Sequence, residues 1–271
     1  MLRYEKADGI ALITLDNPPV NVFTPELHRD LFDILTNFLE DREVRVGILT
    51  ASGNRAFCAG DDIKTQRPHR TIPEMVERHL GRRRRDDACE YPGWEAEVVR
   101  LSEERFKPIV AAVNGPVLGQ GMIYLLRLTD IRIATPNATF GLPEIAYGMA
   151  GASGSLRLAR QIPPTAALWL ALTGEPFGAE EALRNHLINE IVSPETLMAR
   201  ARAVAGKIAA HPPIAVRVEM EAFYRSQDMT AGQATAFTYH LYRLQRTAVA
   251  AVDPLPPLSR RKADKPAISH G

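Results

Sequence analysis

The chain has 271 residues and a mass of 30.0 kDa, enough for one large domain or two small ones with a substantial core. Apolar residues make up 45% and charged residues 24%, which excludes a disordered, collagen-like or coiled-coil protein. The 33 basic and 32 acidic side chains leave a formal charge of +1, so no overall field favours nucleic acid or a membrane surface. Two cysteines, Cys58 and Cys89, are too few for a disulfide framework or a cysteine-based zinc site.

The N-terminal segment carries charged residues where a signal peptide would carry its apolar stretch. The longest apolar run, residues 109–128, is interrupted by polar residues, a proline and three glycines, so no helix there is expected to span a bilayer. We therefore expect a cytoplasmic enzyme that has neither a membrane nor a nucleic acid as its partner.

Short apolar runs that end in turn residues predict four strands, at 10–15, 44–50, 109–113 and 130–135. A helix is predicted to begin at Thr24-Pro25-Glu26, because threonine caps helices, proline suits the first helical position and an acid suits the first turn. Apolar residues at helical spacing predict further helices at 154–162, 178–187, 194–210, 213–226 and 230–252. Strands that alternate with helices indicate an α/β fold.

The organisation of the chain follows from these elements. We assign residues 1–200 to the core and 201–271 to a C-terminal helical region. Residues 67–105 have weak periodicity and contain the run Arg82–Arg85, and we interpret them as a variable helical flap beside the site. The arginine run favours a solvated helix face, and contact with the phosphates of a ligand or with a polyanion such as RNA is the alternative.

Two glycine-containing segments follow predicted strands: AFCAGDDIK at 56–64 and NGPVLGQGM at 114–122, which also opens a helix. Small residues let a ligand approach the backbone closely, and a helix N-terminus offers N–H groups and the positive end of its dipole. Two such turns converging on one carbonyl oxygen would form an oxyanion hole. Either turn alone would indicate only a connection between a strand and a helix.

Other motifs fail on inspection. A dinucleotide-binding fingerprint beginning at Gly119 would need a third glycine where Tyr124 stands. The segment around Ser153 lacks the last glycine of a nucleophile elbow and the strand before it. The seven histidines show no metal-ligand spacing, so no metal site is expected.

Together the segments AFCAGDDIK, PIVAAVNGPVLGQG and DIRIATPNATFGLPEI resemble the crotonase, or enoyl-CoA hydratase/isomerase, superfamily. Its patterns FCAGxDI, AAVNGxxxGGG and DxxIAxxxAxFxxPE occur here in the same order, within a resemblance that runs from about residue 10 to 250. The resemblance implies a spiral of repeated ββα units, a helical C-terminal trimerisation region, and a homotrimer or a dimer of trimers. It also implies an acyl-CoA thioester as substrate, in fatty acid metabolism for example, with coenzyme A as part of the substrate and no separate cofactor.

The resemblance assigns roles to individual residues. The backbone N–H groups of Asp61 and Gln120 would form the oxyanion hole, and Glu144 would be the catalytic carboxylate. An Asp61 carboxylate that faced an enolate would oppose it, so we expect that side chain to point away or to bind another group. Positions that match substrate or coenzyme A contacts are Val20, Ala59, Gly60, Asp62, Ile63, Lys64, Gly119, Gly121, Ile123 and Pro143.

The sequence departs from the family at one decisive position. Hydratases of this family hold a water between two glutamates, and Ile123 stands where the other glutamate is expected. Isoleucine can neither accept a proton nor hold water, so we predict a single-glutamate enzyme with isomerase or lyase chemistry rather than an efficient hydratase. An isolated carboxylate beside Ile123 would be desolvated, which raises its pKa.

Several alternatives remain open at this point. Glu144 would be structural if it merely capped a helix or paired with an arginine. Two other functions stay open: a thioester or β-diketone hydrolase, which would give free coenzyme A or a cleaved ring with no shifted double bond, and a member that binds acyl-CoA without turnover. Hydration would need another group to position the water; the candidates are Asp61, Glu74, Glu77, Glu95 and Tyr147.

Overall fold

The computed structural model describes residues 1–64, 71–80 and 93–252. The chain divides into two compact units, Met1–His211 and Pro212–Gly271. The run Arg82–Arg85 and the tail from Pro254 lie outside the described residues. Within the described part, no helix is both long and apolar enough to cross a membrane.

A six-stranded sheet forms the centre of the first unit. Its strands, in spatial order, are β1 (Leu2–Ala7), β2 (Ile10–Leu15), β3 (Val46–Ala51), β4 (Ile109–Val113), β6 (Ile131–Ala134) and β9 (Glu190–Ile191). β1 pairs with β2 in the antiparallel sense, and the other pairs are parallel. Parallel strands are usually covered on both faces, and accordingly every residue of β3 and β4 is buried.

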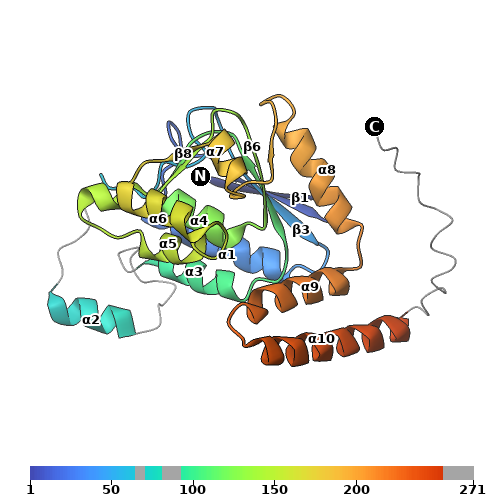
Figure 1. Ribbon diagram of the computed structural model, residues 1–271. Helices are drawn as coiled ribbons and strands as arrows, with labels where there is room; N and C mark the ends of the chain where they lie inside the picture. The colour runs from blue at the N-terminus through green and yellow to red at the C-terminus, as the bar shows by residue number, and fades with distance from the viewer. Residues whose placement is uncertain (65–70, 81–92, 253–271) are drawn as a thin grey trace. The chain divides into compact units, whose positions relative to one another are not determined.

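Helices cover both faces of this sheet (Figure 1). α8 (Leu197–Ala209) lies on one face, where Ala201 and Ala205 pack in a cluster with Ile48 and Val110. α1 (Pro25–Glu40) and α4 (Gln120–Leu128) contribute to the larger apolar core on the other face. The boundary between the two units follows α8, so α8 belongs to the first unit.

The sequence explains how α1 begins. The Thr24 hydroxyl accepts a hydrogen bond from the Leu27 N–H, as the capping pattern predicts. The apolar stripe of the helix, which includes Leu31 and Phe38, is buried. At the other end, the ammonium group of Lys107 donates to the carbonyl oxygen of Phe38 at 2.6 Å, which satisfies an acceptor in the last turn.

The predicted flap contains two helices with different surroundings. α2 (Ile72–Leu80) exposes apolar side chains, with Leu80 at 84%. α3 (Trp94–Glu103) buries Trp94 and Val98, and the Trp94 ring lies 5.2 Å from that of Phe32 in α1. α3 is therefore part of the core, which its weak apolar periodicity does not indicate.

A smaller sheet and its neighbours carry the rest of the first unit. The sheet consists of β5 (Val117–Leu118), β7 (Thr139–Gly141) and β8 (Phe177–Gly178). β7 leads into the short 3₁₀ helix η1 (Pro143–Tyr147), and the helices α5 (Ala152–Leu158), α6 (Pro164–Thr173) and α7 (Ala179–Arg184) complete the unit. η1 thus directly follows β7, and β7 pairs with β5, the strand that lies just before α4.

The second unit is helical, as the sequence predicts. α9 (Pro213–Ser226) and α10 (Ala231–Val252) pack against each other. Large apolar side chains remain exposed on both helices, including Phe223 at 60% and Leu244 at 67%. The mixed α/β class expected from the sequence is confirmed by the two sheets and the helices around them.

Candidate functional site

The two glycine turns lie side by side. The Leu118 N–H donates to the Cys58 carbonyl oxygen at 2.9 Å, and the Cys58 N–H donates to the Pro116 carbonyl oxygen at 3.1 Å. A Cβ atom placed on Gly60 would lie 3.8 Å from the nitrogen of Gln120. Segments about sixty residues apart in the sequence therefore meet through backbone contacts alone.

Three glycines make this approach possible. Gly60 and Gly119 have φ angles of +110° and +54°, which other residues rarely adopt. A Cβ on Gly121 would lie only 2.6 Å from the Cβ of Cys58 and 2.9 Å from its carbonyl oxygen. Gln120 is the first residue of α4, so the backbone hydrogen bonds of the helix do not use its N–H.

A third segment holds the first turn from the other side. The Ala59 N–H donates to the Val20 carbonyl oxygen at 3.0 Å, and the Phe23 N–H donates to the Gly60 carbonyl oxygen at 2.9 Å. The predicted positions Val20, Ala59 and Gly60 therefore come together. Asp62 joins them, because its N–H donates to the carbonyl oxygen of Phe23 at 2.8 Å.

Two further predicted contact residues lie at the surface. Ile63 is 81% exposed, and the Lys64 side chain is exposed as well. The Lys64 N–H donates to a carboxylate oxygen of Asp62 at 2.9 Å. This loop is thus ordered at its backbone while it presents an apolar and a basic side chain to the outside.

Glu144 lies next to the second turn. It follows Pro143, which occupies the first position of η1. Its Oε1 atom is 3.3 Å from the position of a Cβ on Gly119, and its Oε2 atom is 3.3 Å from that of a Cβ on Gly151. Oε2 is buried and has no hydrogen-bond partner among the residues that the structure describes. Burial raises the pKa of Glu144 above its ordinary value.

Ile123 lies in the first turn of α4 and presents only apolar atoms. It is 8% exposed, and its Cγ1 atom is 3.1 Å from the position of a Cβ on Gly154. Gly151, which borders Glu144, precedes Gly154 at the start of α5. Glu144 and Ile123 thus border the same end of α5, one with a carboxylate and the other with an apolar side chain.

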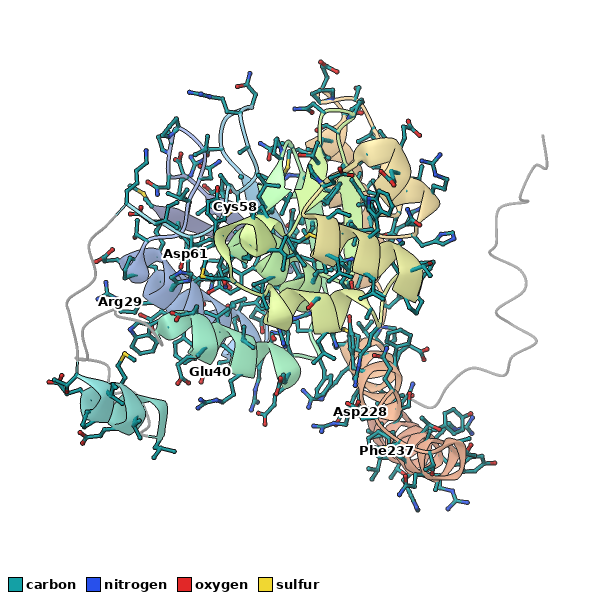
Figure 2. The ribbon with its side chains drawn as sticks, turned by 60° about the vertical axis from the view of Figure 1, so that its left-hand side comes forward. Arg29, Glu40, Cys58, Asp61, Asp228 and Phe237 are labelled. Atoms are coloured by element: carbon teal, nitrogen blue, oxygen red, sulfur yellow. The ribbon has the colours of Figure 1, made fainter. Side chains whose placement is uncertain are left out.

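The Asp61 side chain binds another group, one that the sequence did not single out. Its Oδ1 atom lies 2.8 Å from Nε2 of His28, and Nδ1 of His28 lies 2.6 Å from the hydroxyl of Tyr124. Figure 2 shows Asp61 beside Cys58, close to the end of α1 where Arg29 is labelled. The three residues are 33 and 96 positions apart in the chain, so no local pattern connects them.

The other candidates for holding a water have different surroundings. A Glu74 carboxylate oxygen accepts hydrogen bonds from the N–H and hydroxyl of Thr71 at 2.8 Å, at the start of α2. Glu95 accepts a hydrogen bond from the Gly93 N–H. Burial and then the charge of Glu95 raise the pKa of Tyr124, so Glu95 lies near the group formed by Asp61, His28 and Tyr124. Tyr147 is 71% exposed. Glu77 is exposed on α2.

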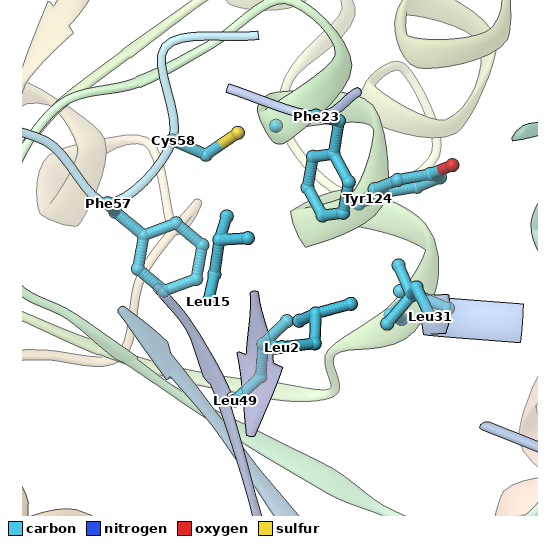
Figure 3. Close-up of a pocket in the computed structure, with 10 residues that line it drawn as sticks. Leu2, Leu15, Phe23, Leu31, Leu49, Phe57, Cys58 and Tyr124 are labelled. Atoms are coloured by element: carbon cyan, nitrogen blue, oxygen red, sulfur yellow. The ribbon is translucent and has the colours of Figure 1, made fainter. Parts of the chain in front are cut away.

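An apolar pocket lies behind the first turn, between the large sheet and the helices α1 and α4 (Figure 3). Leu15, Phe23, Cys58 and Tyr124 are among its lining residues, and the Tyr124 hydroxyl points away from it. Burial raises the pKa of the Cys58 thiol to about 12, so Cys58 acts there as a small apolar residue. Among the described residues, no group of three or more potential metal ligands comes together.

Comparisons with known proteins agree with this geometry. Residues 5–247 match the family model of enoyl-CoA hydratase/isomerase. The chain is 33% identical over 244 residues to an (E)-benzylidenesuccinyl-CoA hydratase of Thauera aromatica, covering 89% of each chain. It is 33% identical over 235 residues to a short-chain-enoyl-CoA hydratase of Clostridium acetobutylicum, covering 86% of this chain and 84% of that one.

The structure is similar to that of an enoyl-CoA hydratase subunit I of Geobacillus kaustophilus, with a TM-score of 0.80 and 28% identity over 99% of this chain and 97% of the other. The crotonase-like fold expected from the sequence is thereby confirmed. The protein belongs to the enoyl-CoA hydratase/isomerase family.

Proposed function

We propose that this protein forms and protonates the enolate of an acyl-CoA thioester, with Glu144 as the group that moves the proton. The observation that carries the proposal is the buried Oε2 atom of Glu144, which has no hydrogen-bond partner among the described residues. Glu144 also lies beside Gly119, at the turn that presents the Gln120 N–H. A carboxyl group with a raised pKa is well suited to receive and return a proton near neutral pH.

The backbone N–H groups of Asp61 and Gln120 would hold the enolate oxygen. The Gln120 N–H stands at the positive end of the α4 dipole, which favours developing negative charge. Because backbone contacts hold the turns in place, these donors would need no reorganisation when the charge forms. Coenzyme A would then enter only as part of the substrate, with no further cofactor.

The reaction that follows enolate formation depends on the residue at position 123. With Ile123 in place of a glutamate, Glu144 alone supports double-bond isomerisation or carbon–carbon cleavage better than the two-glutamate addition of water. The names of the two relatives favour a second candidate, hydration of an enoyl-CoA. Hydration requires another group that holds the attacking water.

We also propose that the protein assembles as a homotrimer or a dimer of trimers. Its support is the set of large apolar side chains left exposed on α6, on α9 and on α10, such as Trp169 at 57% and Phe223 at 60%. Exposed apolar side chains of this size are typical of surfaces that associate. Sedimentation would give the number of subunits, and a monomer would contradict the proposal.

The proposed chemistry is tested by the exchange of solvent deuterium into C2 of a panel of acyl-CoA and enoyl-CoA thioesters, followed by mass spectrometry. Glu144→Gln is expected to lower the exchange rate by ~10²-fold or more, because a positioned acid–base group contributes that much. Glu175→Gln, a change of the same kind at an exposed carboxylate, serves as the control. Exchange that survives Glu144→Gln would remove Glu144 from the mechanism.

The same assay separates the alternative functions. A thioester that binds tightly without exchange would indicate a binding protein. Release of free coenzyme A without exchange would indicate a hydrolase.

A further inference from the structure

Hydrogen bonds connect the side chain of Asp61, one of the two residues proposed to form the oxyanion hole, to the buried side chains of His28 and Tyr124. The Tyr124 hydroxyl lies 2.6 Å from Nδ1 of His28, and Nε2 of His28 lies 2.8 Å from Oδ1 of Asp61. Three side chains, from α4, α1 and the first turn, thus form one continuous path.

The partners of His28 set the direction of its hydrogen bonds. Burial raises the pKa of Tyr124 well above its ordinary value, so the phenol keeps a proton that it can donate to Nδ1 of His28. The Asp61 carboxylate only accepts hydrogen bonds, so Nε2 of His28 is the donor to it.

Asp61 is the most exposed of the three side chains on this path. The side chain of His28 is 2% exposed and Tyr124 is 2% exposed, whereas the side chain of Asp61 is 31% exposed. The ring of His28 also stacks on that of Phe23, with centroids 5.1 Å apart. Rigid, buried neighbours therefore hold a carboxylate that itself borders solvent.

We propose that Asp61 is the second acid–base residue of this site and holds the attacking water, with His28 as its positioning residue. This inference rests on the proposed function, because that function places the thioester carbonyl at the Asp61 N–H. The carboxylate belongs to the same residue as this N–H, so it lies within one side-chain length of the proposed carbonyl position. It would supply the group that Ile123 cannot, and would make hydration the reaction of this enzyme.

The proton balance removes the conflict between a carboxylate and an enolate. The oxygen of water forms a bond to C3 of the enoyl-CoA, the C2–C3 π bond breaks, and a proton of that water passes to Asp61. Glu144 in its protonated form delivers a proton to C2, and exchange with solvent then returns Asp61 and Glu144 to their starting states. Asp61 becomes neutral as the enolate charge develops, whereas a permanently ionised Asp61 would oppose that charge.

This balance predicts opposite effects of one substitution in two assays. Asp61→Asn keeps the backbone N–H and the size of the side chain but cannot take up a proton. Hydration of crotonyl-CoA is expected to fall by ~10²-fold or more. Exchange of deuterium into C2 of butyryl-CoA, which adds no water, is expected to rise, because the opposing charge is gone.

Two further variants separate positioning from a general loss of structure. Asp30→Asn makes the same chemical change at an exposed carboxylate two residues after His28 and serves as the control. His28→Gln keeps an N–H donor, whereas His28→Leu does not, so His28→Gln is expected to retain more of the hydration rate than His28→Leu.

The outcomes distinguish this inference from the function on which it rests. Hydration that is lost while exchange rises supports Asp61 as the base. A parallel fall of both activities in Asp61→Asn, or unchanged hydration, would overturn the inference. A wild-type protein that exchanges C2 through Glu144 but does not hydrate crotonyl-CoA would overturn it too and leave the proposed function standing, whereas the absence of both activities would refute both.

Discussion

Replacing Gly121 with alanine tests whether the contact between the two turns is as close as the structure shows. The new Cβ would lie 2.6 Å from the Cβ of Cys58, whereas carbon atoms pack best at about 3.5–4.0 Å. The turns must therefore separate by about 1 Å, since the carbonyl oxygen of Cys58, at 2.9 Å, also blocks the new atom. Overpacking of this kind costs about 1–3 kcal/mol.

For a chain of this size, a loss of about 2 kcal/mol lowers Tm by about 4–8 °C, which differential scanning calorimetry detects readily. The catalytic rate should fall as well, because a shift of about 1 Å in a positioned group can cost ~10²-fold. Gly206→Ala is the matched control, since nothing lies within 4 Å of its Cβ in the interior of α8. It should raise the free energy of unfolding by up to about 1 kcal/mol through helix propensity.

The two variants should thus shift Tm in opposite directions. A Gly121→Ala protein with the Tm and turnover of the wild type would refute the close approach of the turns. A fall in Tm for both variants would instead mean that any added methyl group is harmful, and the argument from the Cys58 contact would fail.

The remaining predictions concern buried charge. Asp130→Ala should destabilise the protein by about 3–5 kcal/mol in urea denaturation, because it leaves Arg105, whose side chain is 2% exposed, without the carboxylate 2.8 Å away. Glu190→Ala breaks the exposed pair with Arg200 and should cost less than about 1 kcal/mol; equal losses in the two variants would contradict this reasoning. The raised pKa of Glu144 means that the folded protein retains a proton there above pH 4.5, where the unfolded chain has lost it, so this group's contribution to stability falls as pH rises. The Tm of Glu144→Gln minus that of the wild type should therefore increase between pH 4 and pH 8. A Tm difference that does not increase would show that Glu144 is not desolvated.

Elements with a strong local pattern could be predicted from the sequence. The strand at 109–113 and the helix at 213–226 have the predicted bounds. Prolines mark both starts, and Asn114 marks the end of the strand. β1 was missed, since its residues LRYEKA form a charged edge strand that buries little. α6 was missed because PTAALWLALT is apolar on all sides and has no polar face to reveal a helical period.

The site was predictable only in part, and for a related reason. The two glycine turns and Glu144 lie in short segments with unusual composition, so each was visible locally. The partnership of Asp61 with His28 joins residues that only the folded chain brings together. The one available signal was a histidine beside the buried stripe of α1, and such a residue usually indicates nothing beyond packing.

The way the two turns are held has a consequence for how this site can evolve. The bonds that position Asp61 and Gln120 run between backbone atoms of Val20, Phe23, Cys58 and their neighbours, and the close packing depends on glycine. Side chains at 61, 120 and 123 can therefore be exchanged while the proposed donors for a carbonyl oxygen stay in place. If the proposed function holds, a lineage built on such a frame can acquire a new reaction by single substitutions, because binding of the thioester carbonyl would survive each intermediate step.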